Sequence, residues 1–153
     1  MLIKNLSIAA IVKLLAFGFT KEWNINDERQ GGNASYGWFS FTPLMYAVYQ
    51  GDLPLVKELI ENKADLEKKD ELFNFTALMW AALRGRYKVV SYLLTEGADI
   101  KHKAEWNGKM QDAYMLSKKE KCCSLIGFWQ RAQKTLGIAD IDKAHKVIIS
   151  YRK

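Results

Sequence analysis

The sequence predicts an all-α fold: a solenoid of stacked helix pairs with hairpin loops between them, followed by a helical C-terminal extension. The first observation is a phrase that occurs twice, FTPLMYAVYQGD from Phe41 and FTALMWAALRGR from Phe75, at a spacing of 75 − 41 = 34 residues. Self-similarity at a period in the thirties is typical of stacked repeats. The second is helical spacing of apolar residues after each phrase. The third is composition, since 49% hydrophobic and 26% charged residues are typical of a folded chain.

Each copy of the repeat is interpreted as two short helices. Thr42 and Thr76 are expected N-caps, because a threonine hydroxyl can accept from a free amide of the first turn. Pro43 follows at the first helical position, where its missing N–H costs nothing. Gly51 and Gly85 are expected to end the first helix in a left-handed conformation. The predicted buried positions are Leu44, Ala47, Val48, Leu55, Val56, Leu59 and Ile60 in one copy, and Leu78, Ala81, Ala82, Val89, Val90, Leu93 and Leu94 in the other.

These residues resemble the ankyrin repeat, whose pattern is T-P-L-H-x-A, a glycine break, V-x-x-L-L and G-A-D. TPLMYA, QGD, LVKELI and KAD fit in the first copy, and TALMWA, RGR, VVSYLL and GAD fit in the second. Met45 and Met79 depart from the pattern, which usually has histidine there. The resemblance implies three to four repeats. It also implies that partners dock on the hairpin tips and on the exposed side of each first helix.

The flanking segments are interpreted as degenerate repeats. Ile11, Val12 and Leu15 echo Leu55, Val56 and Leu59, which predicts an N-terminal capping repeat. Downstream, NGKMQDAYML fits the pattern with Gly108 in register, Met110 in place of threonine and Asp112 in place of leucine. The expected organisation is an ankyrin-repeat domain over 1–128, with clear repeats at 41–74 and 75–108, and a helical extension over 129–153.

The N-terminal segment has a second interpretation. MLIKNLSIAAIVKLLAFGFT has a basic start and an apolar middle, as a secretory signal does. Lys13 interrupts the apolar run, which is too short to span a bilayer, and no clean cleavage site follows. A capping repeat and a cytoplasmic protein are therefore expected, with a secreted or periplasmic protein as the minority interpretation.

No catalytic motif is present, so the sequence predicts a non-enzymatic protein without a cofactor or metal. It has no glycine-rich phosphate loop, no G-x-S-x-G and no H-E-x-x-H. Cys122 and Cys123 are adjacent, which disfavours a disulfide between them. They are interpreted as small buried residues of a degenerate helix, and the alternative is a redox or soft-metal pair.

The leading functional hypothesis is a monomeric protein-recognition module, of effector, inhibitor or immunity type, that binds one partner protein. Aromatic residues are the usual anchors of protein interfaces. The predicted partner-binding residues are Trp38, Phe39, Phe41, Leu72, Phe73, Phe75, Trp106 and Lys109 at the tips, and Tyr49, Leu83, Arg84 and Lys118 on the first helices. Trp38, Phe39, Phe73 and Trp106 are expected to be exposed. Tyr46, Trp80 and Tyr114 are expected in the core.

The second hypothesis is binding of nucleic acid or an anionic surface through the basic C-terminal third. The formal charge is 23 − 17 = +6, and residues from Lys101 onward carry 12 basic against 5 acidic side chains. The basic candidates are Lys118, Lys119, Lys121, Arg131, Lys134, Lys143, Lys146, Arg152 and Lys153. They are scattered rather than clustered, so this hypothesis ranks second. No membrane span is expected.

Overall fold

The computed structural model describes residues 6–17, 29–30 and 40–136. Its helices are α1 (Ile8–Phe17), α2 (Pro43–Gln50), α3 (Leu53–Glu61), α4 (Ala77–Leu83), α5 (Tyr87–Thr95), α6 (Ala113–Leu116) and α7 (Glu120–Leu136). The strands are β1 (Arg29–Gln30) and β2 (Ser40–Phe41), which pair antiparallel, and β3 (Ala104–Trp106) and β4 (Lys109–Gln111), which form a second antiparallel pair.

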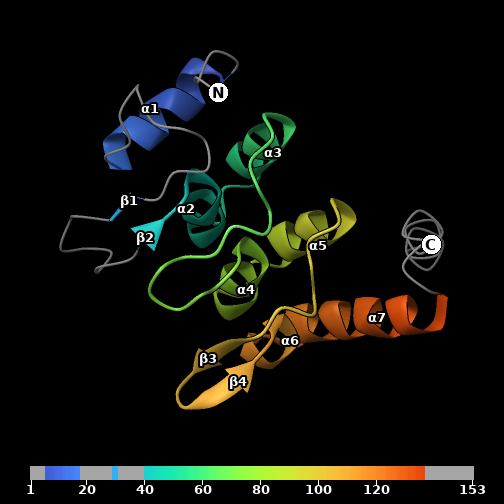
Figure 1. Ribbon diagram of the computed structural model, residues 1–153. Coiled ribbons are helices and arrows are strands. Elements are labelled where there is room, and N and C mark those ends of the chain that lie inside the picture. The colour runs from blue at the N-terminus through green and yellow to red at the C-terminus, as the bar shows by residue number, and fades with distance from the viewer. Residues whose placement is uncertain (1–5, 18–28, 31–39, 137–153) are drawn as a thin grey trace.

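The helices stack in pairs, as predicted. The first helices α2, α4 and α6 pack on one another in one row, and the second helices α3, α5 and α7 pack in another (Figure 1). Helix α1 is tied to α3, because the Ser7 hydroxyl donates to Glu58 Oε2 at 2.9 Å and Lys13 forms an ion pair with Asp52. Each connecting segment between a second helix and the next first helix lies at the same edge of the stack (Figure 1). This repeated arrangement confirms an all-α repeat fold.

The predicted caps form as expected. Thr42 Oγ1 accepts from the Met45 amide at 3.2 Å, and Thr76 Oγ1 accepts from the Met79 amide at 3.4 Å. Gly51 has a φ of 78° and Gly85 a φ of 65°, the left-handed region in which glycine is favoured. Local sequence therefore determines where α2 and α4 begin and end.

Neighbouring units contact each other at the glycine that ends each first helix. A basic side chain of the following unit lies across this glycine. A Cβ on Gly51 would lie 2.9 Å from the Arg86 side chain, so this contact requires glycine. Arg86 donates from Nε and Nη2 to the Tyr49 carbonyl oxygen at 3.2 and 3.0 Å, at the C-terminal end of α2. A cation is favourable there because helix carbonyls carry partial negative charge. Lys119 lies across Gly85 in the next unit.

The predicted apolar stripes form the core. Every predicted position in the two clear repeats is buried except Ile60, which is half-buried. In α1 the buried residues are Ala10 and Leu14, and Ile11 of the predicted stripe is half-buried. The side chains of Val12 and Leu15 lie outside the described residues.

The last unit differs from its predicted register. Asp112 is the N-cap of α6, and its carboxylate accepts from the Met115 amide at 3.0 Å. The prediction that Met110 takes the place of the capping threonine is therefore wrong, because a methionine has no oxygen to cap with. Helix α7 runs unbroken through the boundary expected at 128/129, and Cys122, Ile126 and Trp129 are buried along it. Residues 137–153 of the expected extension lie outside the described residues.

Candidate functional site

The loop between α3 and α4 is organised by one buried carboxylate. Asp70 Oδ1 accepts from the amides of Leu72 and Phe73 at 3.0 and 2.7 Å. Its Oδ2 accepts from the Phe75 amide at 3.1 Å and from Trp80 Nε1 at 2.9 Å. Four groups therefore donate hydrogen bonds to the Asp70 carboxylate, whose residue is 3% exposed. A buried charge requires hydrogen-bond partners of this kind. This carboxylate fixes the loop and attaches it to α4.

Six aromatic rings pack together behind this loop. We call them the aromatic cluster: Phe41, Tyr49, Phe73, Phe75, Trp80 and Trp106. Trp80 lies at its centre, with ring centroids at 5.1 Å from Phe41 and 5.4 Å from Phe75. Most of the ring contacts are tilted or edge-to-face, which are favoured arrangements for aromatic pairs. The cluster connects segments from three successive units.

The β3–β4 hairpin lies next to the loop. The Trp106 ring is 5.0 Å from the Phe73 ring, centroid to centroid. Trp106 pairs with Lys109, and a tight turn at Asn107 and Gly108 joins the strands with φ values of 53° and 72°. His102 Nε2 lies 2.8 Å from the Asn74 carbonyl oxygen, and since a carbonyl only accepts, Nε2 is the donor. The loop and the hairpin therefore form one continuous surface.

We call this surface the hairpin face and define it by Leu72, Phe73, Trp106 and Lys109. Leu72 is 56% exposed, Lys109 is exposed, and Phe73 and Trp106 are half-buried. The two rings pack on the aromatic cluster, so the part of each ring that remains exposed is held in a fixed position. The hairpin face offers an apolar contact area with little freedom to lose on binding.

The predicted residues of the first helices lie at or just after the C-terminal ends of those helices. The segments that form the hairpin face precede the N-terminal ends of α4 and α6. The Arg84 guanidinium lies over the Tyr49 ring, 4.3 Å from its centroid. Tyr49 and Leu83 are half-buried, whereas Arg84 and Lys118 are exposed. We call the exposed cations Arg84 and Lys118 the basic patch. Tyr49 also contacts the rings of Phe41 and Trp80, so it links Arg84 to the aromatic cluster.

Two predicted tip residues are buried instead. Phe41 and Phe75 are 1% and 0% exposed, so their assignment to a partner-binding surface is wrong. Each directly precedes a capping threonine, and this position turns its ring into the aromatic cluster. The expectation that Phe73 and Trp106 are exposed is corrected to half-buried. Trp38 and Phe39 lie outside the described residues.

The expected core positions give a mixed outcome. Trp80 is buried, Tyr46 is half-buried and Tyr114 is 40% exposed, so the assignment of Tyr114 to the core is wrong. A hydrogen bond with the Cys123 thiol raises the pKa of the Tyr114 hydroxyl. Sequence reasoning also missed Asp70, although an aspartate five residues before the repeated phenylalanine is a recognisable loop signal.

The cysteines show the features of packing residues. Cys122 is buried and Cys123 is half-buried, and both are free thiols. Burial raises the pKa of the Cys122 thiol, which keeps it protonated and a poor nucleophile. Within residues 6–17, 29–30 and 40–136, no three His, Cys, Asp or Glu side chains gather as metal ligands. In the same ranges no helix is both long and apolar enough to cross a membrane.

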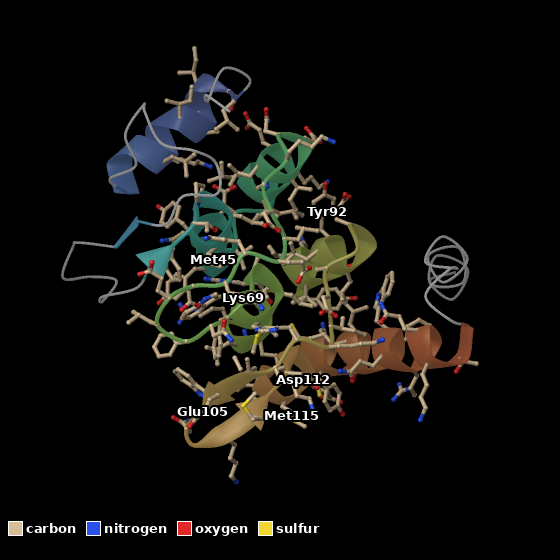
Figure 2. The ribbon with its side chains drawn as sticks, in the orientation of Figure 1. Met45, Lys69, Tyr92, Glu105, Asp112 and Met115 are labelled. Atoms are coloured by element: carbon tan, nitrogen blue, oxygen red, sulfur yellow. The ribbon has the colours of Figure 1, made fainter. Side chains whose placement is uncertain are left out.

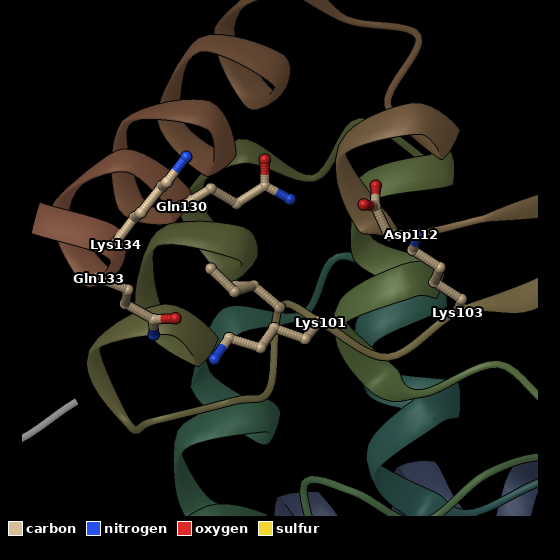
Figure 3. A pocket seen from close by; sticks show the side chains of 7 residues that line it. Lys101, Lys103, Asp112, Gln130, Gln133 and Lys134 are labelled. Atoms are coloured by element: carbon tan, nitrogen blue, oxygen red, sulfur yellow. The ribbon is translucent and has the colours of Figure 1, made fainter. Parts of the chain in front are cut away.

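A basic pocket lies between α7 and the segment that joins α5 to β3 (Figure 3). It has a volume of about 360 Å³ and is lined by Ile100, Lys101, Lys103, Asp112, Gln130, Gln133 and Lys134. Helix α7 supplies the two glutamines and Lys134, and the segment between α5 and β3 supplies the other two lysines. Three cations against one carboxylate make the pocket electropositive.

A family model described as ankyrin repeats, in three copies, matches residues 3–104. No curated protein matches the sequence. Ankyrin repeats are generally protein–protein interaction modules, and the family is typically non-enzymatic. The match covers 104 − 3 + 1 = 102 of the 153 residues and ends where β3 begins. With this match and its stacked helix pairs, the chain belongs to the ankyrin repeat family.

Proposed function

We propose that this protein binds one partner protein through the hairpin face, with a further contribution from the basic patch of Arg84 and Lys118 at the C-terminal ends of the first helices. The observation that carries the proposal is the pair of half-buried rings, Phe73 and Trp106, beside the 56% exposed Leu72. Aromatic anchors in well-packed surroundings supply much of the binding energy in protein interfaces.

The chemistry of the surface indicates the chemistry of the partner. Leu72 and the exposed parts of the two rings fit an apolar side chain that packs against them. Lys109 is an exposed cation on the hairpin face, and Arg84 and Lys118 are exposed cations at or just after the C-terminal ends of the first helices. A partner with an apolar anchor flanked by acidic residues would match both features, since complementary charge guides association and specificity.

The proposal is tested by capturing partners on the tagged full chain from its native lysate, with nuclease present and at low and high salt. The variant Leu72→Asp removes the exposed apolar anchor, and Ile8→Asp is the matched control because Ile8 is 82% exposed and lies on α1. We expect the wild type and Ile8→Asp to retain one stoichiometric protein at high salt, and Leu72→Asp to lose it.

Folding is checked by circular dichroism and thermal unfolding. Both substitutions replace exposed side chains, so the free energy of unfolding should change by less than about 0.5 kcal/mol. A folded Leu72→Asp variant that captures the same protein as the wild type would contradict the proposal.

A second candidate function is binding of nucleic acid or another polyanion along α7. The three lysines of the basic pocket favour it, together with the exposed Lys118, Lys119, Lys121 and Arg131. The remaining basic residues, Lys143, Lys146, Arg152 and Lys153, lie outside the described residues. This function would lose affinity steeply with salt, because phosphate contacts release counterions. Capture that disappears with nuclease or salt would therefore favour it.

A further inference from the structure

The basic pocket gathers three lysines from two segments that are distant in the sequence. Lys134 lies on α7, whereas Lys101 and Lys103 lie between α5 and β3. All three side chains are exposed. In the part of the chain that the structure describes, none of the three ammonium groups forms an ion pair with a carboxylate. The stack therefore brings together positive charges that can act on a ligand.

Two glutamine side chains add neutral donors to these charges. Gln130 and Gln133 are half-buried on α7, and both line the pocket. Figure 3 shows them with Lys134 on α7, whereas Lys103 lies on the other side of the pocket beside Asp112. Neither glutamine amide has a hydrogen-bond partner among the described residues. Since each amide can donate two hydrogen bonds, the pocket offers donors that the fold itself does not use.

The carboxylate of the pocket also serves the fold. Asp112 lies between β4 and the start of α6 (Figure 2). Its Oδ1 accepts from the Met115 amide and so caps α6. With three lysines and this one carboxylate, the lining carries a formal charge of 3 − 1 = +2. This charge matches that of a phosphate monoester, which is close to a dianion at neutral pH.

We propose that the basic pocket binds a small phosphate monoester, a molecule that carries one phosphate group on a compact organic part. Phosphate oxygens are strong acceptors, and lysine binds them as a point charge. The glutamine amides can donate to the same oxygens. The pocket volume of about 360 Å³ is near the lower end for small-molecule sites, so the organic part is about the size of one sugar.

The neighbouring cations face elsewhere, which favours a compact ligand over a long polyanion. Lys121 precedes Gln130 by 130 − 121 = 9 residues, about 2.5 helical turns, so it lies on the opposite side of α7 and lines a different pocket. Lys119 lies across the glycine that ends α4, and Arg131 lies close to Tyr114. These three cations therefore do not extend the basic pocket into a continuous track.

The basic pocket is independent of the proposed partner-binding surface. None of its lining residues belongs to the hairpin face or to the basic patch. A ligand can therefore occupy the pocket whether or not a partner protein is bound, and failure of one proposal leaves the other standing.

An NMR titration of the backbone amides of the full chain tests the proposal with glucose 6-phosphate, and glucose is the uncharged control ligand. We expect saturable shifts in residues 100–103 and 130–134 with glucose 6-phosphate and none with glucose. Lys134→Gln should weaken binding about ten-fold, the usual effect of losing one charge-assisted hydrogen bond. Lys121→Gln is the matched control, because it removes the same charge from the opposite side of the same helix, and it should bind like the wild type.

The same spectra report whether each variant is folded. If Lys134→Gln loses the dispersed signals of α7, Lys101→Gln replaces it, since Lys101 lies on the other segment of the pocket and should show the same loss of affinity. Absence of shifts at the pocket, or equal weakening by Lys121→Gln and by the pocket variant, would overturn the proposal. A single-stranded oligonucleotide that displaces glucose 6-phosphate and binds more than a hundred-fold tighter would assign the lysines to nucleic acid and also overturn it.

Discussion

The α3–α4 loop and the β3–β4 hairpin occupy the same place in successive units but are closed by different interactions. In the loop, the Asp70 carboxylate gathers three backbone amides and the Trp80 indole. At the equivalent position, 34 residues on, stands Ala104. There the chain is closed by a backbone ladder from Ala104↔Gln111 to Trp106↔Lys109.

The segment before the N-cap of α6 is two residues longer than the one before the N-cap of α4, and this length accounts for the different way in which it is closed. The cap of α4 lies 76 − 70 = 6 residues after Asp70, and the cap of α6 lies 112 − 104 = 8 residues after Ala104. The longer segment can pair with itself, so it does not need a side chain to satisfy its amides. The loop therefore depends on one carboxylate, whereas the hairpin distributes its stability over several backbone bonds.

The largest expected effect comes from Asp70→Asn. An amide has one acceptor oxygen for four donors, so buried N–H groups are left without partners, and the free energy of unfolding should fall by about 2–3 kcal/mol. Chemical denaturation measures it. Asp99→Asn is the control, because Asp99 is exposed and accepts from one amide, that of Lys101. Equal losses in the two variants would show that the Asp70 network does not hold the loop.

A smaller difference in stability is expected between alanine substitutions of Gly51, at the end of α2, and of Gly108, in the β3–β4 turn. Gly51 and Gly108 both have positive φ, so alanine strains the backbone by about 1 kcal/mol at either position. A Cβ at Gly51 would also press on Arg86, whereas nothing lies within 4 Å of one at Gly108. Thermal unfolding should therefore show Gly51→Ala to be the more destabilising change. The reverse order would mean that Arg86 moves aside at no cost.

Local chemistry explains what the sequence predicted well. The threonine caps, the terminating glycines and the apolar stripes depend on neighbouring residues, so they can be recognised wherever the phrase recurs. These three features are sufficient to predict both the fold of the two clear repeats and the family of the chain.

The predictions fail where side-chain packing decides the outcome. Phe41 and Phe75 are predicted at the tips, but both rings pack against Trp80 in the aromatic cluster. Tyr114 is predicted in the core together with Tyr46 and Trp80, yet it is 40% exposed. The register of the last unit was recoverable from Asn107-Gly108, a strong signal for a tight hairpin turn, followed by Asp112 as a good N-cap.

The most direct test of the proposed function maps where the captured partner contacts the chain. Hydrogen exchange of backbone amides would be measured by mass spectrometry on the full chain, free and bound. We expect added protection in residues 70–75 and 104–109 and at the C-terminal end of α4, with little change along α7. Protection concentrated on α7 and the basic pocket, with the hairpin face unchanged, would contradict it.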